Sequence, residues 1–241
     1  MAPRMGNRRG LGGRRGRDLG SARTPPIRGT SWHAHADPDT RREVWQTPSL
    51  RVPFLTMIEL STERLVLRPF SADDVEALHA LWADREVRRY LFDGEVPARE
   101  RVVEIVENSV EGFAEHGYGF FSLRQRHAPT AIMGFSGFRP FDEAGVVEML
   151  FAVEPASWGS GFATEAGREV LRYGFEQCDL RRVVATTDTP NQRSVRVLQR
   201  LGLFFEKRRE RHGLDTVYYA MTADEFQASD LQSEKTVGVA E

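Results

Sequence analysis

The sequence predicts a mixed α/β domain of the α+β class, with a mostly antiparallel sheet covered by helices on both faces. Three observations support this fold class. Strand-like and helix-like segments alternate from residue 57 onward. Three consecutive strand-like runs, separated by turn residues, predict an antiparallel meander in the middle of the chain. A helix, a strand and another helix then follow, which indicates crossovers that cover the sheet.

The first half of the patterned region begins with RLVLRPF (64–70), whose apolar residues alternate as in a strand. SADDVEALHALWAD (71–84) predicts a helix, because Ser71 is a good N-cap and acidic residues follow it. A second helix is expected from about 97 to 116. The meander strands are expected at 119–125, 131–138 and 146–153.

The second half should begin with a helix from about 163, followed by a strand at 181–187 and a helix at 191–201. Two strands close the domain, at 203–210 and 214–221. One face of the first of these helices is small, which lets the helix lie close to the sheet. That face consists of Ala163, Ala166, Gly167, Val170 and Gly174.

Residues 1–56 differ in composition from the rest. They hold eleven arginines against four acidic residues, whereas the remainder carries nine more acidic than basic residues. We expect a disordered Arg/Gly/Pro-rich extension here, because it lacks any periodic apolar pattern. It would be a basic arm that contacts nucleic acid or a targeting peptide. Alternatively, translation starts at Met57, and residues 1–56 come from a start codon that was assigned too far upstream.

Several classes of protein are excluded by composition. Cys178 is the only cysteine, so an internal disulfide framework and a cysteine-rich zinc site are ruled out. The six histidines show no HExxH-type spacing, and we expect no metal. No apolar run approaches the roughly 20 residues of a membrane span. We therefore expect a cytoplasmic protein that does not contact a membrane.

The stretch PASWGSGFATEAGREVLRYGF (155–175) places glycines directly before a helix. The free N–H groups of a first helical turn, with the positive end of the helix dipole, form an anion site, and glycines let a phosphate approach the backbone. A tight turn alone is the alternative. A P-loop is excluded because Phe162 and Ala163 follow Gly161, and Thr164 breaks the dinucleotide motif GxGxxG/A.

Three motifs occur in order at 154–203: W-G-x-G-[YF]-A-T-E-A, N-x-x-S and L-x-x-L-G-[FL]. They resemble the GNAT superfamily of N-acetyltransferases, in the branch of the ribosomal-protein N-terminal acetyltransferases RimJ and RimL. The segment LSTERLVLRPFSADDVEALHALWADREVRRYL (60–91) resembles the opening of the same branch. The resemblance spans about 59–222 and implies the GNAT fold, a twisted sheet of six to seven strands splayed into a V. Trp158 replaces the superfamily's Gln or Arg, and Leu203 replaces the commoner Phe.

The resemblance implies acetyl-CoA as co-substrate. The backbone of Phe151 and Val153 would pair with the pantetheine arm, Asn191 would contact the coenzyme, and Ser194 would lie near its sulfur. The pyrophosphate would bind the amides of Gly159, Ser160, Gly161, Phe162, Ala163 and Thr164. From the residues alone, Asn191 is also a good N-cap, and a bond from Ser194 to a carbonyl of its own helix is the alternative for that hydroxyl.

Acetyl transfer needs a neutral amine, so a base is expected, acting directly or through water. Glu148, alone among apolar neighbours in VVEMLFAV, is the candidate; an ion pair with Arg139 is its alternative role. Amides near Leu150 would polarise the thioester carbonyl. We call residues 159–161 the glycine turn. Cys178 is expected at the far end of the following helix, away from this turn, so we expect direct attack in a ternary complex rather than an acyl-cysteine.

The acceptor is expected to be a protein N-terminal α-amine or a small-molecule amine, and the acidic domain weakly favours a cationic one. Two other functions stay open: a non-catalytic acyl-CoA-binding module, and nucleic-acid binding through the basic arm, which we do not expect. We predict a domain at 57–224, a flexible tail at 225–241, and a monomer or homodimer. Aromatic residues that would line an acceptor site or the core are Trp82, Tyr90, Phe92 and Phe113.

Overall fold

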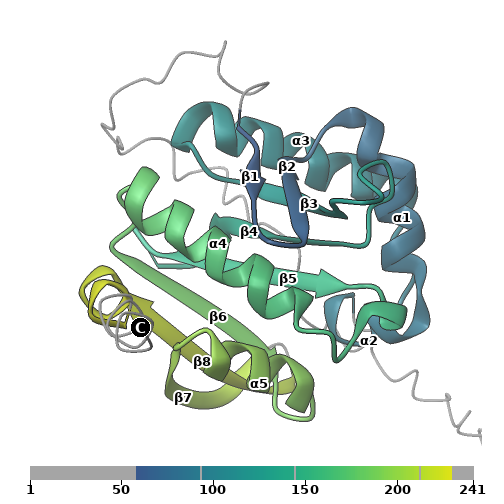
Figure 1. Cartoon of the computed structure of the whole chain (residues 1–241). Helices are drawn as coiled ribbons and strands as arrows, with labels where there is room; N and C mark the ends of the chain where they lie inside the picture. Colours follow the sequence, from purple (N-terminus) through teal and green to yellow (C-terminus); the bar gives the residue numbers. More distant parts are fainter. Residues whose placement is uncertain (1–57, 93, 144, 212, 230–241) are drawn as a thin grey trace, which may run out of the picture.

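The computed structural model describes residues 58–229, except 93, 144 and 212. The expected extension at 1–56, the domain start at 57 and the last part of the tail, 230–241, lie outside the described residues. Within them, one open sheet has the strand order β1-β2-β3-β4-β5-β6-β8-β7, with helices on both faces (Figure 1). The predicted mixed α/β architecture is confirmed.

All neighbouring strands are antiparallel except the pair β5 and β6. The sheet has eight strands, one more than the upper end of the expected range of six to seven. The extra strand is β1, whose two residues are too few to show an alternating pattern in the sequence. The strands are β1 Leu60–Ser61, β2 Leu65–Pro69, β3 Phe120–Gln125, β4 Gly134–Pro140, β5 Val147–Val153, β6 Arg182–Asp188, β7 Phe204–Arg211 and β8 Leu214–Thr222.

The segment 71–84 is not one continuous helix. A 3-10 turn, η2 (Ala72–Asp74), leads into α1 (Val75–Ala83), and a further helix, α2 (Arg85–Leu91), follows directly. Asp84 starts α2, because its carboxylate accepts hydrogen bonds from the amides of Glu86 at 2.8 Å and Val87 at 3.2 Å. The other helices are α3 Arg99–His116, α4 Phe162–Gln177 and α5 Gln192–Arg200, with a 3-10 turn η3 at Pro155–Ser157.

The helices divide between the two faces of the sheet (Figure 1). The first three, α1 to α3, enclose an aromatic cluster that includes Phe70, Trp82 and Phe135, all 1% exposed or less. On the other face, α4 and α5 pack on the apolar side chains of β5, β6 and β8. Both faces of the sheet from β2 to β6 are therefore covered, as the predicted crossovers indicated, whereas the side chains of β7 are mostly exposed.

The predicted small face of α4 is confirmed by its close approach to the sheet. A Cβ atom on Gly174 would lie 2.7 Å from Cε2 of Phe138 in β4, and one on Gly167 would lie 3.1 Å from Cε of Met149 in β5 and 2.8 Å from Cδ1 of Leu201. Neither position has room for a larger side chain. The helix that carries the glycine turn is thus held firmly against β4.

The strands β5 and β6 pair with each other only near their N-terminal ends, at Val147 with Val183 and at Glu148 with Val184. Beyond these pairs both strands continue, to Val153 and Asp188, without pairing to each other. The expected V is therefore present, and it opens between the only parallel neighbours of the described sheet.

The chain beyond β8 packs against the domain as far as it is described. Residues 223–229 are helical, and Phe226 is 7% exposed with its ring stacked on Phe175 at 5.0 Å between centroids. The Thr222 amide donates to Glu225 Oε2 at 2.8 Å, and the Glu225 amide donates to Thr222 Oγ1 at 3.4 Å. This reciprocal cap starts the helix at 223–229, so the boundary predicted at 224 falls inside a helix, and the flexibility of the tail stays a prediction.

No helix among the described residues is long and apolar enough to cross a membrane.

Candidate active site

A cavity of about 890 Å³ fills the V between β5 and β6. It is lined by α2, by the diverging ends of the two strands, by the glycine turn with the start of α4, and by α5. Most of the predicted cofactor residues line it; Ser160 does not. Those that do are Phe151, Val153, Gly159, Gly161, Phe162, Ala163, Thr164, Asn191 and Ser194.

The glycine turn has the backbone geometry that only glycine adopts without strain. Gly159 and Gly161 have φ angles of 79° and 83°, and Gly161 is the N-cap of α4. The Thr164 amide donates to the Gly161 carbonyl at 3.1 Å, so it is not free for a phosphate, contrary to our expectation. Among the described residues, the amides of Phe162 and Ala163 have no backbone acceptor, which leaves them open for an anion.

Trp158, which replaces the superfamily's Gln or Arg, makes two contacts beside the glycine turn. Its indole N–H donates to the Val153 carbonyl at 2.7 Å, and the Arg193 guanidinium lies 4.3 Å from its ring centroid. The side chain therefore ties the glycine turn to the end of β5. The Val153 carbonyl, which we expected to meet the pantetheine arm, already has this partner.

The start of α5 places two predicted residues at the cavity. Asn191 caps the helix as predicted, with Oδ1 accepting from the Ser194 amide at 3.3 Å. Within the described part of the chain, the Ser194 hydroxyl has no hydrogen-bond partner. The alternative bond to a carbonyl of its own helix is therefore absent there, and the hydroxyl is available to a ligand.

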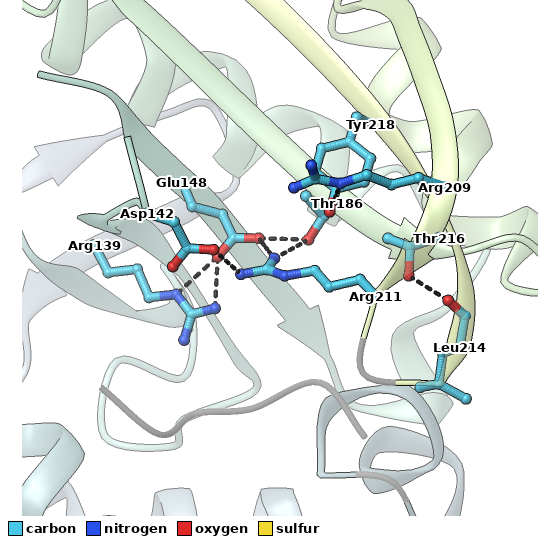
Figure 2. A network of polar contacts seen from close by, with 9 residues as sticks. All are labelled: Arg139, Asp142, Glu148, Thr186, Arg209, Arg211, Leu214, Thr216 and Tyr218. Atoms are coloured by element: carbon cyan, nitrogen blue, oxygen red, sulfur yellow. Dashed lines mark hydrogen bonds and ion pairs between the residues drawn. The ribbon is translucent and has the colours of Figure 1, made fainter. Parts of the chain in front are cut away.

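Glu148 sits at the bottom of the V, 1% exposed, in the polar network of Figure 2. Its Oε2 accepts from Arg139 Nε at 2.9 Å and Nη2 at 2.5 Å, which confirms the ion pair with Arg139. Its Oε1 accepts the Thr186 hydroxyl at 2.5 Å and lies 3.6 Å from Arg211 Nη1. Arg211 also donates to Asp142 Oδ2 at 2.9 Å.

The Glu148 carboxylate is not among the groups that line the cavity, whereas Thr186 lines it and hydrogen-bonds to Glu148. Thr186 therefore lies between this carboxylate and the cavity. The sequence shows Glu148 among apolar neighbours, but Thr186 and Arg211 reach it from β6 and β7. Those partners were missed because nothing local in the sequence pairs them with β5.

Other residues at the cavity were also missed. Arg193, Arg196 and Arg200 recur at helical spacing on α5, a pattern that is visible in the sequence. With Arg89, they give the lining four guanidinium groups against one carboxylate, that of Glu86. The cavity is therefore cationic, although the domain as a whole is acidic.

Of the four aromatic residues considered as liners, only Tyr90 lines the cavity. Trp82 is 0% exposed and Phe113 is 4% exposed, and both belong to the apolar cores. Phe92 packs against the Trp82 ring, with centroids 5.5 Å apart. The other three are thus core residues.

Cys178 follows the last residue of α4, at the opposite end of this 16-residue helix from the glycine turn. At 1.5 Å per residue, the helix separates the two ends by about 24 Å. Burial raises the pKa of the Cys178 thiol to about 11. Position and protonation both exclude it as a nucleophile at the cavity. Among the described residues, no group of three or more His, Cys, Asp or Glu could hold a metal ion.

Comparisons with known proteins agree with this geometry. An "Uncharacterized N-acetyltransferase p20" of Bacillus licheniformis is 33% identical over 150 residues, which cover 60% of this chain and 82% of that protein. RimL, a ribosomal L7/L12 α-N-protein acetyltransferase solved with coenzyme A, superposes with a TM-score of 0.60 at 18% identity, over 70% of this chain and 99% of RimL.

Spermidine N-acetyltransferase from Vibrio cholerae, solved with CoA and spermine, has a TM-score of 0.58 at 16% identity, over 69% of this chain and 99% of that chain. At these identities the two structures show a shared fold. The family described as "Acetyltransferase (GNAT) domain" matches residues 64–203, more than half of the 241 residues. The chain therefore belongs to the GNAT family and is an acetyltransferase.

Proposed function

We propose that this chain moves the acetyl group of acetyl-CoA to a primary amine by direct attack in a ternary complex. The observation that carries the proposal is the cavity between β5 and β6, which has an anion-binding turn at one end and α2 at the other. A long cofactor lying through the V would present its thioester where the strands part, with the acceptor entering past α2. Two structural neighbours were solved with CoA, which supports this reading.

The cofactor's phosphates would lie at the glycine turn. Open amides of Phe162 and Ala163 and the positive end of the α4 dipole favour an anion there. Arg193, Arg196 and Arg200 add positive charge along the neighbouring wall. Pantetheine would follow β5 past Phe151, beyond the point where β6 stops pairing.

In the chemical step, the neutral amine attacks the thioester carbonyl carbon, the C–N bond forms, and the C–S bond breaks. Strand amides near Leu150 would polarise the carbonyl, and the Ser194 hydroxyl would hydrogen-bond to the departing thiolate. The amine proton passes to the Thr186 oxygen while the Thr186 proton passes to Glu148 Oε1, 2.5 Å away. Arg139 holds Glu148 in position for this transfer.

We infer that the acceptor is a monoamine, such as a peptide α-amine or a small amine, rather than a polyamine. At α2, where the acceptor would enter, the lining has Arg89 and only one carboxylate, that of Glu86, so it offers little to bind a polycation. The cationic acceptor suggested by the net charge of the domain is therefore not favoured at the site. An α-amine, with a pKa of about 7.7–8.0 against about 10.4 for lysine, also loses its proton more readily. Membership of the RimJ/RimL branch would fit this acceptor and stays a prediction.

The test is an amine panel with the full-length protein and acetyl-CoA, in which the thiol of released CoA is followed. We expect turnover with peptides of varied N-termini, little with spermidine, and intersecting initial-velocity lines. Parallel lines would indicate a covalent acyl-enzyme and contradict direct attack. If acetyl-CoA binds but no amine is turned over, and Glu148→Gln and Ser194→Ala behave like the wild type, the chain is an acyl-CoA-binding module.

A further inference from the structure

Ser160 is the residue of the glycine turn that does not line the cavity. Its carbonyl oxygen accepts a hydrogen bond from Arg64 Nη1 at 3.0 Å. Arg64 directly precedes β2, almost a hundred residues earlier in the chain. Its guanidinium lies 4.4 Å from the Phe162 ring centroid, and its Nη2 would be 3.5 Å from a Cβ on Gly161. The opening of the domain thus reaches the turn that begins α4.

Glu165, in the first turn of α4, fixes Arg64 in place. Its Oε2 accepts from Arg64 Nε at 2.6 Å and lies 2.5 Å from Nη2, while its Oε1 accepts from the Arg64 amide at 3.0 Å and the Thr62 hydroxyl at 2.5 Å. Burial works against ionisation of Glu165, but hydrogen bonds from Thr62 and Arg64 outweigh it and hold its pKa below the ordinary value. Arg64 therefore has a charged partner that binds two of its guanidinium nitrogens through one carboxylate oxygen.

The geometry of the peptide bond gives this contact a consequence for the cavity. The Ser160 carbonyl and the Gly161 N–H belong to one planar trans peptide, so they point in opposite directions. Because the carbonyl is held by Arg64, which does not line the cavity, the Gly161 N–H would point toward the side on which Gly159 and Gly161 line it. Glycines on either side of Ser160 would otherwise let this peptide rotate.

We propose that Arg64 is a positioning residue for the cofactor: it fixes the Ser160–Gly161 peptide so that the Gly161 amide is set in advance for the pyrophosphate of CoA. Glu165 holds the arginine and neutralises its charge. The inference rests on the proposed function, because it presumes that CoA binds at the turn. Setting the amide before binding removes an ordering cost that would otherwise weaken affinity.

The test compares the dissociation constants of CoA and dephospho-CoA for the full-length wild type, Arg64→Met and Arg64→Lys. Titration calorimetry is run at a temperature where circular dichroism shows every variant folded. Arg68→Met is the matched control: Arg68 lies in β2, is similarly exposed and pairs with Glu59 at 2.8 Å, with no contact to the turn among the described residues. We expect Arg64→Met to weaken both ligands about tenfold, Arg64→Lys to weaken them less, and Arg68→Met to leave them unchanged.

The outcomes separate this inference from the proposed function. If the wild type does not bind CoA, the proposed function is wrong. If the wild type binds CoA and both Arg64 variants bind it equally well, only the inference is wrong, even when their melting temperatures fall, because Arg64 then has a purely structural role. Weaker binding of CoA but not of dephospho-CoA would place Arg64 on the 3′-phosphate and also overturn it. Should Arg64→Met fail to fold, Arg64→Lys decides.

Discussion

Thr186 is the single residue on which the proposed chemistry depends most. It lines the cavity and at the same time donates its hydroxyl to Glu148, a carboxylate that is itself 1% exposed. Two arginines neutralise that carboxylate, which explains how a charge is tolerated at the centre of a sheet. A buried acid held in this way is useful only if something connects it to the substrate, and the Thr186 hydroxyl does so.

Replacement of this hydroxyl tests the connection. Thr186→Val keeps the shape of the side chain but removes the proton path, so kcat should fall about 100-fold while the KM for acetyl-CoA changes little. Thr186→Ser restores the hydroxyl and should recover most of the rate. Steady-state kinetics with the best amine of the panel measures both variants. Equal kcat values for Thr186→Val and the wild type would show that Glu148 does not act through Thr186.

Cys178 provides a pH-dependent prediction. Its pKa of about 11 in the folded protein lies above its ordinary value of 9.0. The thiol therefore stabilises the fold fully below pH 9, and this contribution is lost as the pH rises from 9 through 11. A thiol reagent at pH 8 should label the native protein far more slowly than the urea-unfolded protein, and Cys178→Ala should keep full activity. Rapid native labelling with loss of activity would contradict the assignment.

At the scale of elements, α4 links the anion site to the core. Its N-terminus carries the glycine turn, its middle packs through Ala166 and Val170, and Gly174 lies against Phe138. The position of the turn relative to β5 is therefore set by packing about three helical turns away. A change that lifts the helix from the sheet should disturb both stability and cofactor binding.

The variant Gly174→Ala tests how closely α4 packs on the sheet. An unhindered helical glycine gains about 1 kcal/mol when it is replaced by alanine. Here the new methyl group would lie 2.7 Å from the Phe138 ring, so overpacking should instead reduce the free energy of unfolding by about 1–3 kcal/mol. Urea denaturation measures the change. Stabilisation would contradict the close approach of helix and sheet.

The sequence was informative about elements wherever a local pattern existed. The small face of α4, the cap of α5 by Asn191 and the meander of β3 to β5 are all local features, and each was predicted. Helix α2 was missed because Asp84 both ends α1 and caps the next helix. Contacts such as Arg64 with Ser160 and Arg211 with Glu148 join distant segments, and no single-sequence pattern reveals them.

At the scale of the whole molecule, the sheet is parted at one place and the function is concentrated there. Among the residues that the structure describes, seven strand pairs hold it together, and the parallel pair of β5 and β6 is the one that opens. The two apolar cores lie on opposite faces of the sheet, and both β5 and β6 are packed into the core under α4 and α5, so a cofactor inserted between these strands would meet packed walls. The charges follow the same division, with arginines at the cavity of an acidic domain.

The central claim is that this opening binds acetyl-CoA, and calorimetric titration of the full-length protein with acetyl-CoA tests it most directly. We predict one molecule bound per chain and, at 100 times the dissociation constant, a rise in melting temperature of about 5–10 °C. Ala163→Glu, which puts a carboxylate at the open amides, should abolish binding, whereas Ala156→Glu on the exposed turn η3 should not. Absence of binding heat and of any thermal shift at millimolar acetyl-CoA would contradict the claim.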